Sequence, residues 1–209
     1  MMPRRPILLA GVIASIIATP YSARAQRAAD TLTSSFTVDG IPVILRRNTA
    51  NNVVVANVYL LGGTRQITAA NAGIEPFLLS VSERGTQHYP KAVLRRKVSL
   101  LGSDFVVAPS SDWSLFGART ITTALDSTWA IFADRLMYPA IQPAEVELVR
   151  QQLLSAVQQE RDDPDAYVAD LADSVAFSGH PYGLSPTGTA SSIRAITAQQ
   201  LRAYQQSQT

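Results

Sequence analysis

The chain has 209 residues, of which 46% are hydrophobic and 16% are charged. This length is enough for one domain with a sizeable core, and this composition excludes a disordered chain. The chain contains no cysteine, which excludes disulfide scaffolds and thiolate metal sites.

The first 25 residues have the pattern of a secretory signal peptide, with a buried N-terminal helix as the alternative. Arg4 and Arg5 precede an apolar run over 7–18 that is too short to cross a bilayer, and 23–25 form an A-x-A cleavage pattern. Cleavage there leaves 15 of the 18 basic residues against 16 acidic ones. We therefore expect a bacterial protein that is exported to the periplasm or the exterior, without a stable membrane span and without a nucleic-acid footprint.

Strands are predicted mainly in the first half of the chain. After a polar lead-in over 26–35, residues 36–38 and 41–45 are expected to pair around an Asp39-Gly40 turn. A β-branched apolar run predicts a further strand over 53–61. Two more strands are expected over 105–108 and 113–122, on either side of a Pro-Ser-Ser-Asp turn.

Helices are predicted mainly in the second half, from apolar residues spaced three and four apart. Pro76 is compatible with the first of these helices only in its opening turn. Asp163-Pro164 interrupts the long helix, and 179–183 are expected to form a loop. The predicted helices cover 71–82, 91–101, 124–137, 143–159, 167–177 and 198–204. This order predicts an α+β fold, a two-layer sandwich of an antiparallel-rich sheet with helices on one face.

Residues 72–89 read AGIEPFLLSVSERGTQHY. This stretch resembles the signature helix of the pitrilysin/insulinase family of zinc metallopeptidases, in which an inverted H-x-x-E-H motif supplies two zinc ligands and a general base. Gly73-Ile74 matches the start of the signature, and 84–86 with Tyr89-Pro90 matches its end. Pro76, Leu79 and Ser80 stand where the family has its His, Glu and His.

The resemblance extends over about 36–205 through weaker motifs that occur in the family's order. They are Asp39-Gly40, the glycine turn over 60–64, Leu-Gly at 101–102, the loop 180–183, Gly188 and the helix start over 196–201. The resemblance implies the N-terminal domain of such a peptidase. It implies a single domain over 36–209 that ends before a last strand and a second, similar domain.

The family's third zinc ligand and a second glutamate lie on the long helix, and counting back from Asp163-Pro164 places these positions at Val149 and Ala156. Together with Leu153 and Val157 they are expected to form an apolar stripe. The family's cofactor is zinc, but here the resemblance leaves no ligand or general base, so we predict no catalytic residue, no metal site and no cofactor. Apolar side chains are expected to refill the site as core.

Other residues with reactive or charged side chains are more simply explained by structural roles. His88 or His180 could form a new metal site with Glu75, Glu83 or Glu160, but loop roles are favoured. Ser80 or Ser82 could join a histidine and an aspartate in a nucleophilic triad, although no G-x-S-x-G motif is present. The charged runs 83–84 and 95–97 are interpreted as solvated helix faces, and Trp113 and Phe116 as sheet aromatics.

Three hypotheses for function follow. The first is a non-catalytic peptidase-like domain that acts as partner or scaffold subunit of an active zinc peptidase homologue. The second is an autonomous module that binds extended peptides by β-strand addition, at the edge formed by Phe105, Val106, Val107 and Ala108. The third is an active metallopeptidase with atypical ligands.

Overall fold

The computed structural model describes residues 32–208. The predicted signal peptide over 1–25 and most of the lead-in lie outside this range. The chain divides into two compact units, one up to Thr49 and one from Ala50 onward, and each is described by itself.

The first unit contains a β-hairpin of β1 (Thr33–Val38) and β2 (Ile41–Arg46), which pair antiparallel. Asp39 and Gly40 connect the strands with φ of 48° and 84°. Positive φ at both turn residues matches the twist of the flanking strands. This confirms the predicted hairpin and corrects one boundary, because β1 begins at Thr33 and takes residues 33–35 from the predicted lead-in.

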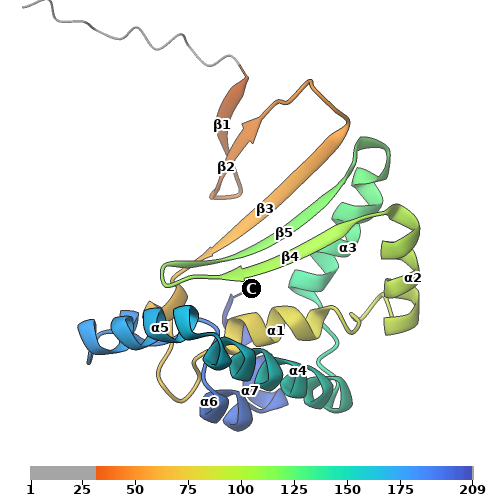
Figure 1. Ribbon diagram of the computed structural model, residues 1–209. Coiled ribbons are helices and arrows are strands. Elements are labelled where there is room, and N and C mark those ends of the chain that lie inside the picture. The colour runs from red at the N-terminus through yellow and green to blue at the C-terminus, as the bar shows by residue number, and fades with distance from the viewer. Residues whose placement is uncertain (1–31, 209) are drawn as a thin grey trace, which may run out of the picture. The chain divides into compact units, whose positions relative to one another are not determined.

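The second unit is built on a three-stranded antiparallel sheet (Figure 1). Its strands are β3 (Val53–Leu61), β4 (Asp104–Pro109) and β5 (Trp113–Ile121), in the order β3-β5-β4. The central strand β5 is the most buried of the three, and β3 alternates between exposed and half-buried residues. Alternation of this kind is typical of a sheet with one covered face.

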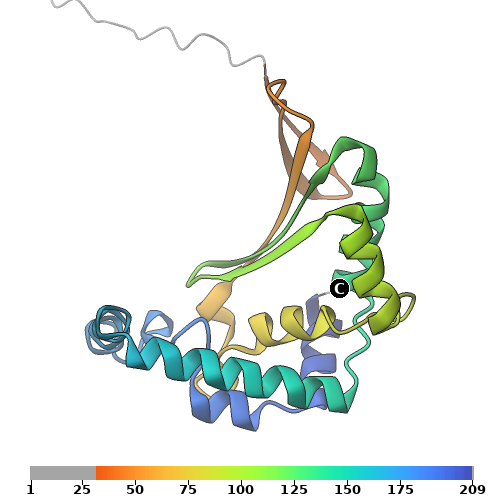
Figure 2. The same ribbon diagram turned by 45° about the vertical axis from the view of Figure 1, so that its right-hand side comes forward.

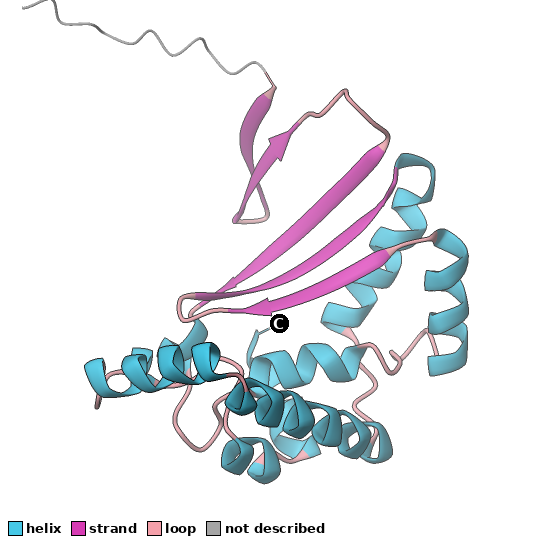
Figure 3. Cartoon of the chain, viewed as in Figure 1, coloured by secondary structure: helices cyan, strands magenta, loops and turns pink. Residues whose placement is uncertain are grey.

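Seven helices are described in this unit, and they lie on one side of its sheet (Figures 2 and 3). They are α1 (Ile74–Ser82), α2 (Lys91–Leu101), α3 (Leu125–Met137), α4 (Pro143–Asp162), α5 (Pro164–Ala176), α6 (Ala190–Ala195) and α7 (Ala198–Gln208). Short 3-10 turns cover Gly63–Gln66, Thr122–Ala124 and Pro181–Gly183. The α+β architecture is confirmed. The sequence pattern does not predict the short helix α6.

Helix α1 lies between two hydrophobic clusters, and all but one of its residues are buried. Toward the sheet, Leu79 packs with Phe116, Ala118 and Phe132. On its other sides α1 packs against α4 and α7, in a cluster made of Ile74, Phe77, Leu78, Val81, Ile141, Val146, Val149, Val157, Ile193, Ile196 and Leu201. A helix that is apolar all round is a central core element.

The start of α1 is fixed by two glycines that pack backbone to backbone. Gly73 has φ of 83°, and a Cβ built on it would lie 2.6 Å from the carbonyl oxygen of Thr187. Gly188 has φ of 88°, and its Cβ would lie 2.6 Å from the carbonyl oxygen of Ala72. Only glycine allows this approach at these dihedral angles. Among the helices of residues 32–208, none is both long and apolar enough to cross a membrane.

Candidate functional site

The signature helix is compatible with its proline. Pro76 is the third residue of α1, and the first helical hydrogen bond of α1 is donated by the N–H of Phe77 to the carbonyl of Gly73. A proline in this turn removes no intrahelical hydrogen bond, because the N–H groups of the first turn have no intrahelical acceptor. The sequence prediction that Pro76 belongs to the opening turn is therefore confirmed.

Two of the three residues at the signature positions are buried. Pro76 is buried and lines a cavity of about 10 Å³ beside Glu75, which is about the room of one water molecule and excludes a peptide. Leu79 is 2% exposed within the cluster under the sheet. Ser80 is half-buried. Proline and leucine carry no atom that can bind a metal, so these residues do not fit the zinc ion of the family signature.

The two positions on α4 lie in different surroundings. Val149 is 1% exposed and belongs to the cluster around α1, and Leu153 and Val157 pack there too. Ala156 is exposed. The predicted apolar stripe is therefore wrong at this one position. Val157 packs into the core, and its neighbour Ala156 consequently lies on the solvent side of the helix.

The histidines are engaged in local contacts. His88 Nδ1 lies 2.5 Å from Asp134 Oδ1, and His180 Nδ1 accepts a hydrogen bond of 3.2 Å from the N–H of Tyr182. The Ser82 hydroxyl donates to the carbonyl of Leu79 at 2.6 Å, so the structure does not bring it to a histidine as a triad requires. Within residues 32–208, no three His, Asp or Glu side chains are grouped so that they could hold a metal ion.

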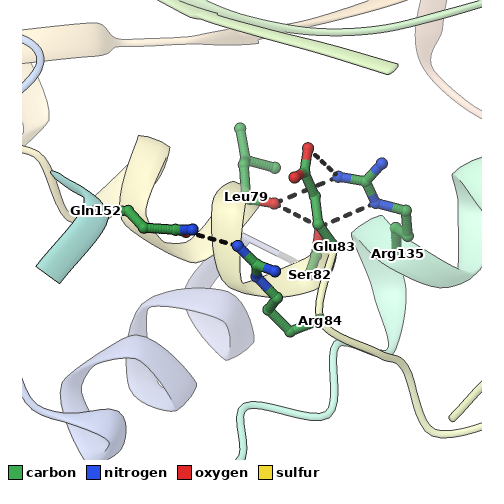
Figure 4. Close-up of polar contacts among 6 residues, drawn as sticks. All are labelled: Leu79, Ser82, Glu83, Arg84, Arg135 and Gln152. Atoms are coloured by element: carbon green, nitrogen blue, oxygen red, sulfur yellow. Dashed lines mark hydrogen bonds and ion pairs between the residues drawn. The ribbon is translucent and has the colours of Figure 1, made fainter. Parts of the chain in front are cut away.

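A buried cation stands at the C-terminal end of α1 (Figure 4). Arg135 reaches across from α3, and its side chain is 3% exposed. Its Nε donates to the Ser82 hydroxyl at 3.2 Å, and its Nη2 lies 3.3 Å from Glu83 Oε1. The guanidinium also lies over the rings of Phe105 and Phe116, at 4.7 and 5.0 Å from their centroids. Burial lowers the pKa of Arg135, and the charge of Glu83 opposes that shift.

This cation opens onto a groove of about 840 Å³ between α2 and the edge of the sheet. The groove is lined by Glu83, Lys91, Ala92, Leu94, Arg95, Arg96, Val98, Ser99, Ser103, Asp104, Phe105 and Arg135. Among the described strands, β4 pairs on one side only, with β5. Residues 105–108 therefore lie on an edge strand of the sheet, and Phe105 lines the groove and also packs against the core.

Sequence reasoning overlooked Arg135 although a signal for it was present. Thr128, Ile131 and Phe132 are buried on one face of α3, and a residue three positions after Phe132 belongs to that same face. Arg135 occupies the position. A charge at a core position of an amphipathic helix indicates a buried cation that needs a partner. Glu83, which its charged run predicts to lie on a solvated face, supplies one.

Comparison with known proteins decides the family. The family model described as Insulinase (Peptidase family M16) matches residues 42–190. The chain belongs to the insulinase family. The resemblance found in its sequence motifs is therefore confirmed.

The chain is also similar to known proteins in sequence and in fold. A probable mitochondrial-processing peptidase subunit beta from Schizosaccharomyces pombe is 27% identical over 142 residues, which cover 68% of this chain and 31% of the relative. The chain thus spans about a third of the length of this relative. The structure of a peptidase M16 inactive domain from Pseudomonas fluorescens has a TM-score of 0.72 at 18% identity, covering 82% of this chain and 42% of that one. The periplasmic protease PqqL from Escherichia coli gives 0.76 at 16% identity, covering 86% and 21%. Both solved structures share the fold of this chain.

Proposed function

We propose that this chain is a non-catalytic insulinase-family domain that serves as a partner or scaffold for a catalytically competent homologue. The observation that carries this proposal is the burial of Pro76 and Leu79 at two of the signature positions. A catalytic zinc needs three protein ligands and a water, and a side chain without a donor atom, held in a packed core, supplies none of them. An exported location is part of this proposal.

Three further observations support it. A sequence relative is named as a subunit, and a solved structure of the same fold is described as an inactive domain. The sheet of the second unit also exposes apolar side chains on the face away from α1 and α3, with Val55 at 61%, Tyr59 at 52% and Leu61 at 73%. An apolar surface of this kind is typical of a contact face between proteins.

The experiment compares the purified chain with and without an insulinase-family protein of the same organism that has an intact H-x-x-E-H. We expect no stoichiometric zinc and no peptide cleavage by the chain alone, and a complex of the two proteins in size-exclusion chromatography. A pair of substitutions on the exposed sheet face, Val55→Asp with Leu61→Asp, is expected to abolish the complex. The matched pair Val168→Asp with Val175→Asp, at exposed positions of α5, is expected to leave it intact. Chelator-sensitive cleavage by the chain alone would establish an active metallopeptidase with atypical ligands instead.

A second candidate function, the binding of extended peptides by strand addition, is favoured by one observation. The edge strand β4 is unpaired on one side among the described strands and borders a groove large enough for a peptide. Strand addition depends on main-chain hydrogen bonds, which need no catalytic side chain. It is tested with two peptides of one sequence, one of them N-methylated at alternate residues. Loss of binding by the methylated peptide supports strand addition, and equal binding of the two excludes it.

A further inference from the structure

The groove between α2 and β4 has an uneven charge. Four cationic side chains line it, and only two anionic ones do. The cations are Lys91, Arg95, Arg96 and Arg135, and the anions are Glu83 and Asp104. A concave surface with one excess sign of charge concentrates ligands of the opposite sign.

Ion pairs within the protein account for part of this charge but not for all of it. Glu83 pairs with Arg135, and Asp104 pairs with Arg119, which stands outside the groove lining. Lys91 pairs with Glu145, with Nζ lying 2.6 and 2.8 Å from its two carboxylate oxygens. Each anion of the lining is thus already bound to a cation.

The other two cations of the groove lining are Arg95 and Arg96. Both are exposed on α2, and neither has an ion-pair partner among residues 32–208. Two guanidinium groups therefore face a groove that also contains a sheet edge. A carboxylate is the natural partner of a guanidinium, because the two planar groups can form two parallel hydrogen bonds.

Arg135 adds donor capacity where the groove meets the core. Its Nε and Nη2 make the contacts with Ser82, Leu79 and Glu83, whereas Nη1 makes no hydrogen bond within the described chain (Figure 4). Glu83 is 48% exposed and is shared with solvent. Arg135 therefore has one donor nitrogen that its internal contacts do not use, at the inner wall of the groove.

We infer that the groove binds an extended peptide segment with acidic side chains, which adds to β4 and directs carboxylates toward Arg95, Arg96 and Arg135. The inference rests on the strand-addition function proposed above and specifies its ligand. β4 has six residues, and at about 3.3 Å per residue a paired segment of equal length extends about 20 Å. Side chains at alternate positions of that segment point to the same side, so glutamate at every second position presents a row of carboxylates to α2.

The test measures fluorescence anisotropy with three labelled probes and the purified chain. The first is an octapeptide that alternates glutamate with threonine or valine, the second has glutamine in place of each glutamate, and the third is a single-stranded oligonucleotide of the same charge as the first. We expect the acidic octapeptide to bind at least about tenfold more tightly than its glutamine counterpart at low salt. We expect this advantage to shrink as salt is added.

Matched variants separate a local effect from net charge. Arg95→Gln with Arg96→Gln is expected to remove most of the advantage of the acidic octapeptide and to leave the affinity for the glutamine octapeptide unchanged. Arg161→Gln with Arg194→Gln changes the net charge equally at exposed positions outside the groove and is expected to preserve the advantage.

Different negative results would overturn the acidic preference and the strand-addition function. Equal affinities for the acidic and glutamine octapeptides would overturn the acidic preference and leave strand addition standing. Binding of neither octapeptide would overturn strand addition itself. An equal loss of affinity in both double variants would reduce the effect to net charge and overturn the assignment to α2. Oligonucleotide binding that Arg95→Gln with Arg96→Gln abolishes would overturn a peptide ligand in favour of polyanions in general.

Discussion

The hydroxyl of Tyr204 donates a hydrogen bond of 2.5 Å to Oε2 of Glu75 and thereby joins α7 to the opening turn of α1. Glu75 is 7% exposed, and its other oxygen, Oε1, is buried without a hydrogen-bond partner in residues 32–208. The hydroxyl of Tyr204 is therefore the one hydrogen-bond donor to the Glu75 carboxyl group within the described residues. Burial of a polar group in this manner is costly unless its remaining hydrogen bond is kept.

Tyr204→Phe is expected to lower the free energy of unfolding by about 1–3 kcal/mol, since it leaves a buried carboxyl group without its donor. Urea denaturation followed by circular dichroism measures this loss. Tyr59→Phe is the matched control, because Tyr59 is 52% exposed and its hydroxyl makes no hydrogen bond within the described chain. Equal losses in the two variants would contradict the role of the Glu75 contact.

The same contact predicts a dependence on alkaline pH. Burial, and then the hydrogen bond and charge of Glu75, raise the pKa of Tyr204 above its ordinary value of 10.0. The folded protein keeps this proton at a pH where the unfolded chain loses it, so the contribution to stability is complete below about pH 10 and declines above it, by at most about 1.4 kcal/mol per pH unit. Unfolding free energies of wild type and Tyr204→Phe, measured from about pH 9 to about pH 11, are expected to converge. The pKa of Tyr182 is also raised, by its hydrogen bond to Asp112. Tyr182 is present in both proteins, so its effect on stability cancels in the comparison. Parallel curves would refute the linkage.

The contact between Gly73 and Gly188 makes a second stability prediction. Gly73→Ala is expected to lower the free energy of unfolding by about 2–5 kcal/mol. An alanine would have to adopt a left-handed conformation there, and its Cβ would also clash with the backbone of Thr187. Gly179→Ala separates these two costs. Gly179 has φ of 80°, with no atom within 4 Å of a built Cβ, so only the conformational cost of about 1–2 kcal/mol applies. Thermal unfolding of both variants tests the difference, and equal losses would exclude a close-packing role.

Most helices and strands could be predicted from the sequence because their signals are local. The positions of Pro76 and Gly102 follow from the backbone preferences of these residues, and Gly102 ends α2 in the left-handed conformation. The hairpin turn at Asp39-Gly40 is equally local. Signals of this kind need no knowledge of the rest of the chain.

The errors arise where tertiary packing decides. Helix α6 is six residues long and contains one large apolar residue, Ile193, so it shows no helical repeat of apolar residues. It is held by a capping box at Thr189 and Ser192, and by the bond from the Ser192 hydroxyl to the carbonyl of Ala72, 120 residues away. The partner of Arg135 is also remote in sequence, since Glu83 is the C-cap residue of α1 and lies 52 residues away. No local pattern encodes such pairs.

Position 79 gives a direct test of the packed signature helix. Leu79→Glu introduces the family's residue into a cluster of Phe116, Ala118 and Phe132. We expect a loss of at least about 3 kcal/mol, because a carboxyl group is then buried among apolar side chains. Leu171→Glu is the control at a leucine that is 49% exposed on α5, where a change within about 0.5 kcal/mol is expected. A stable Leu79→Glu protein would show that position 79 can still hold a catalytic-type glutamate, and it would weaken the non-catalytic proposal.

Glu83→Gln connects the stability of the Arg135 cluster with the proposed ligand. It removes the negative charge that compensates Arg135, so we expect a loss of about 1–2 kcal/mol in unfolding free energy. Asp104→Asn breaks a pair whose side chains are about two-thirds exposed and is expected to cost much less. In binding, Glu83→Gln is expected to strengthen the association with the acidic octapeptide, since the internal competitor for the Arg135 guanidinium has lost its charge. Denaturation and anisotropy on one preparation measure both effects. Weaker binding by Glu83→Gln would show that Glu83 and not Arg135 faces the peptide, and would remove Arg135 from the site.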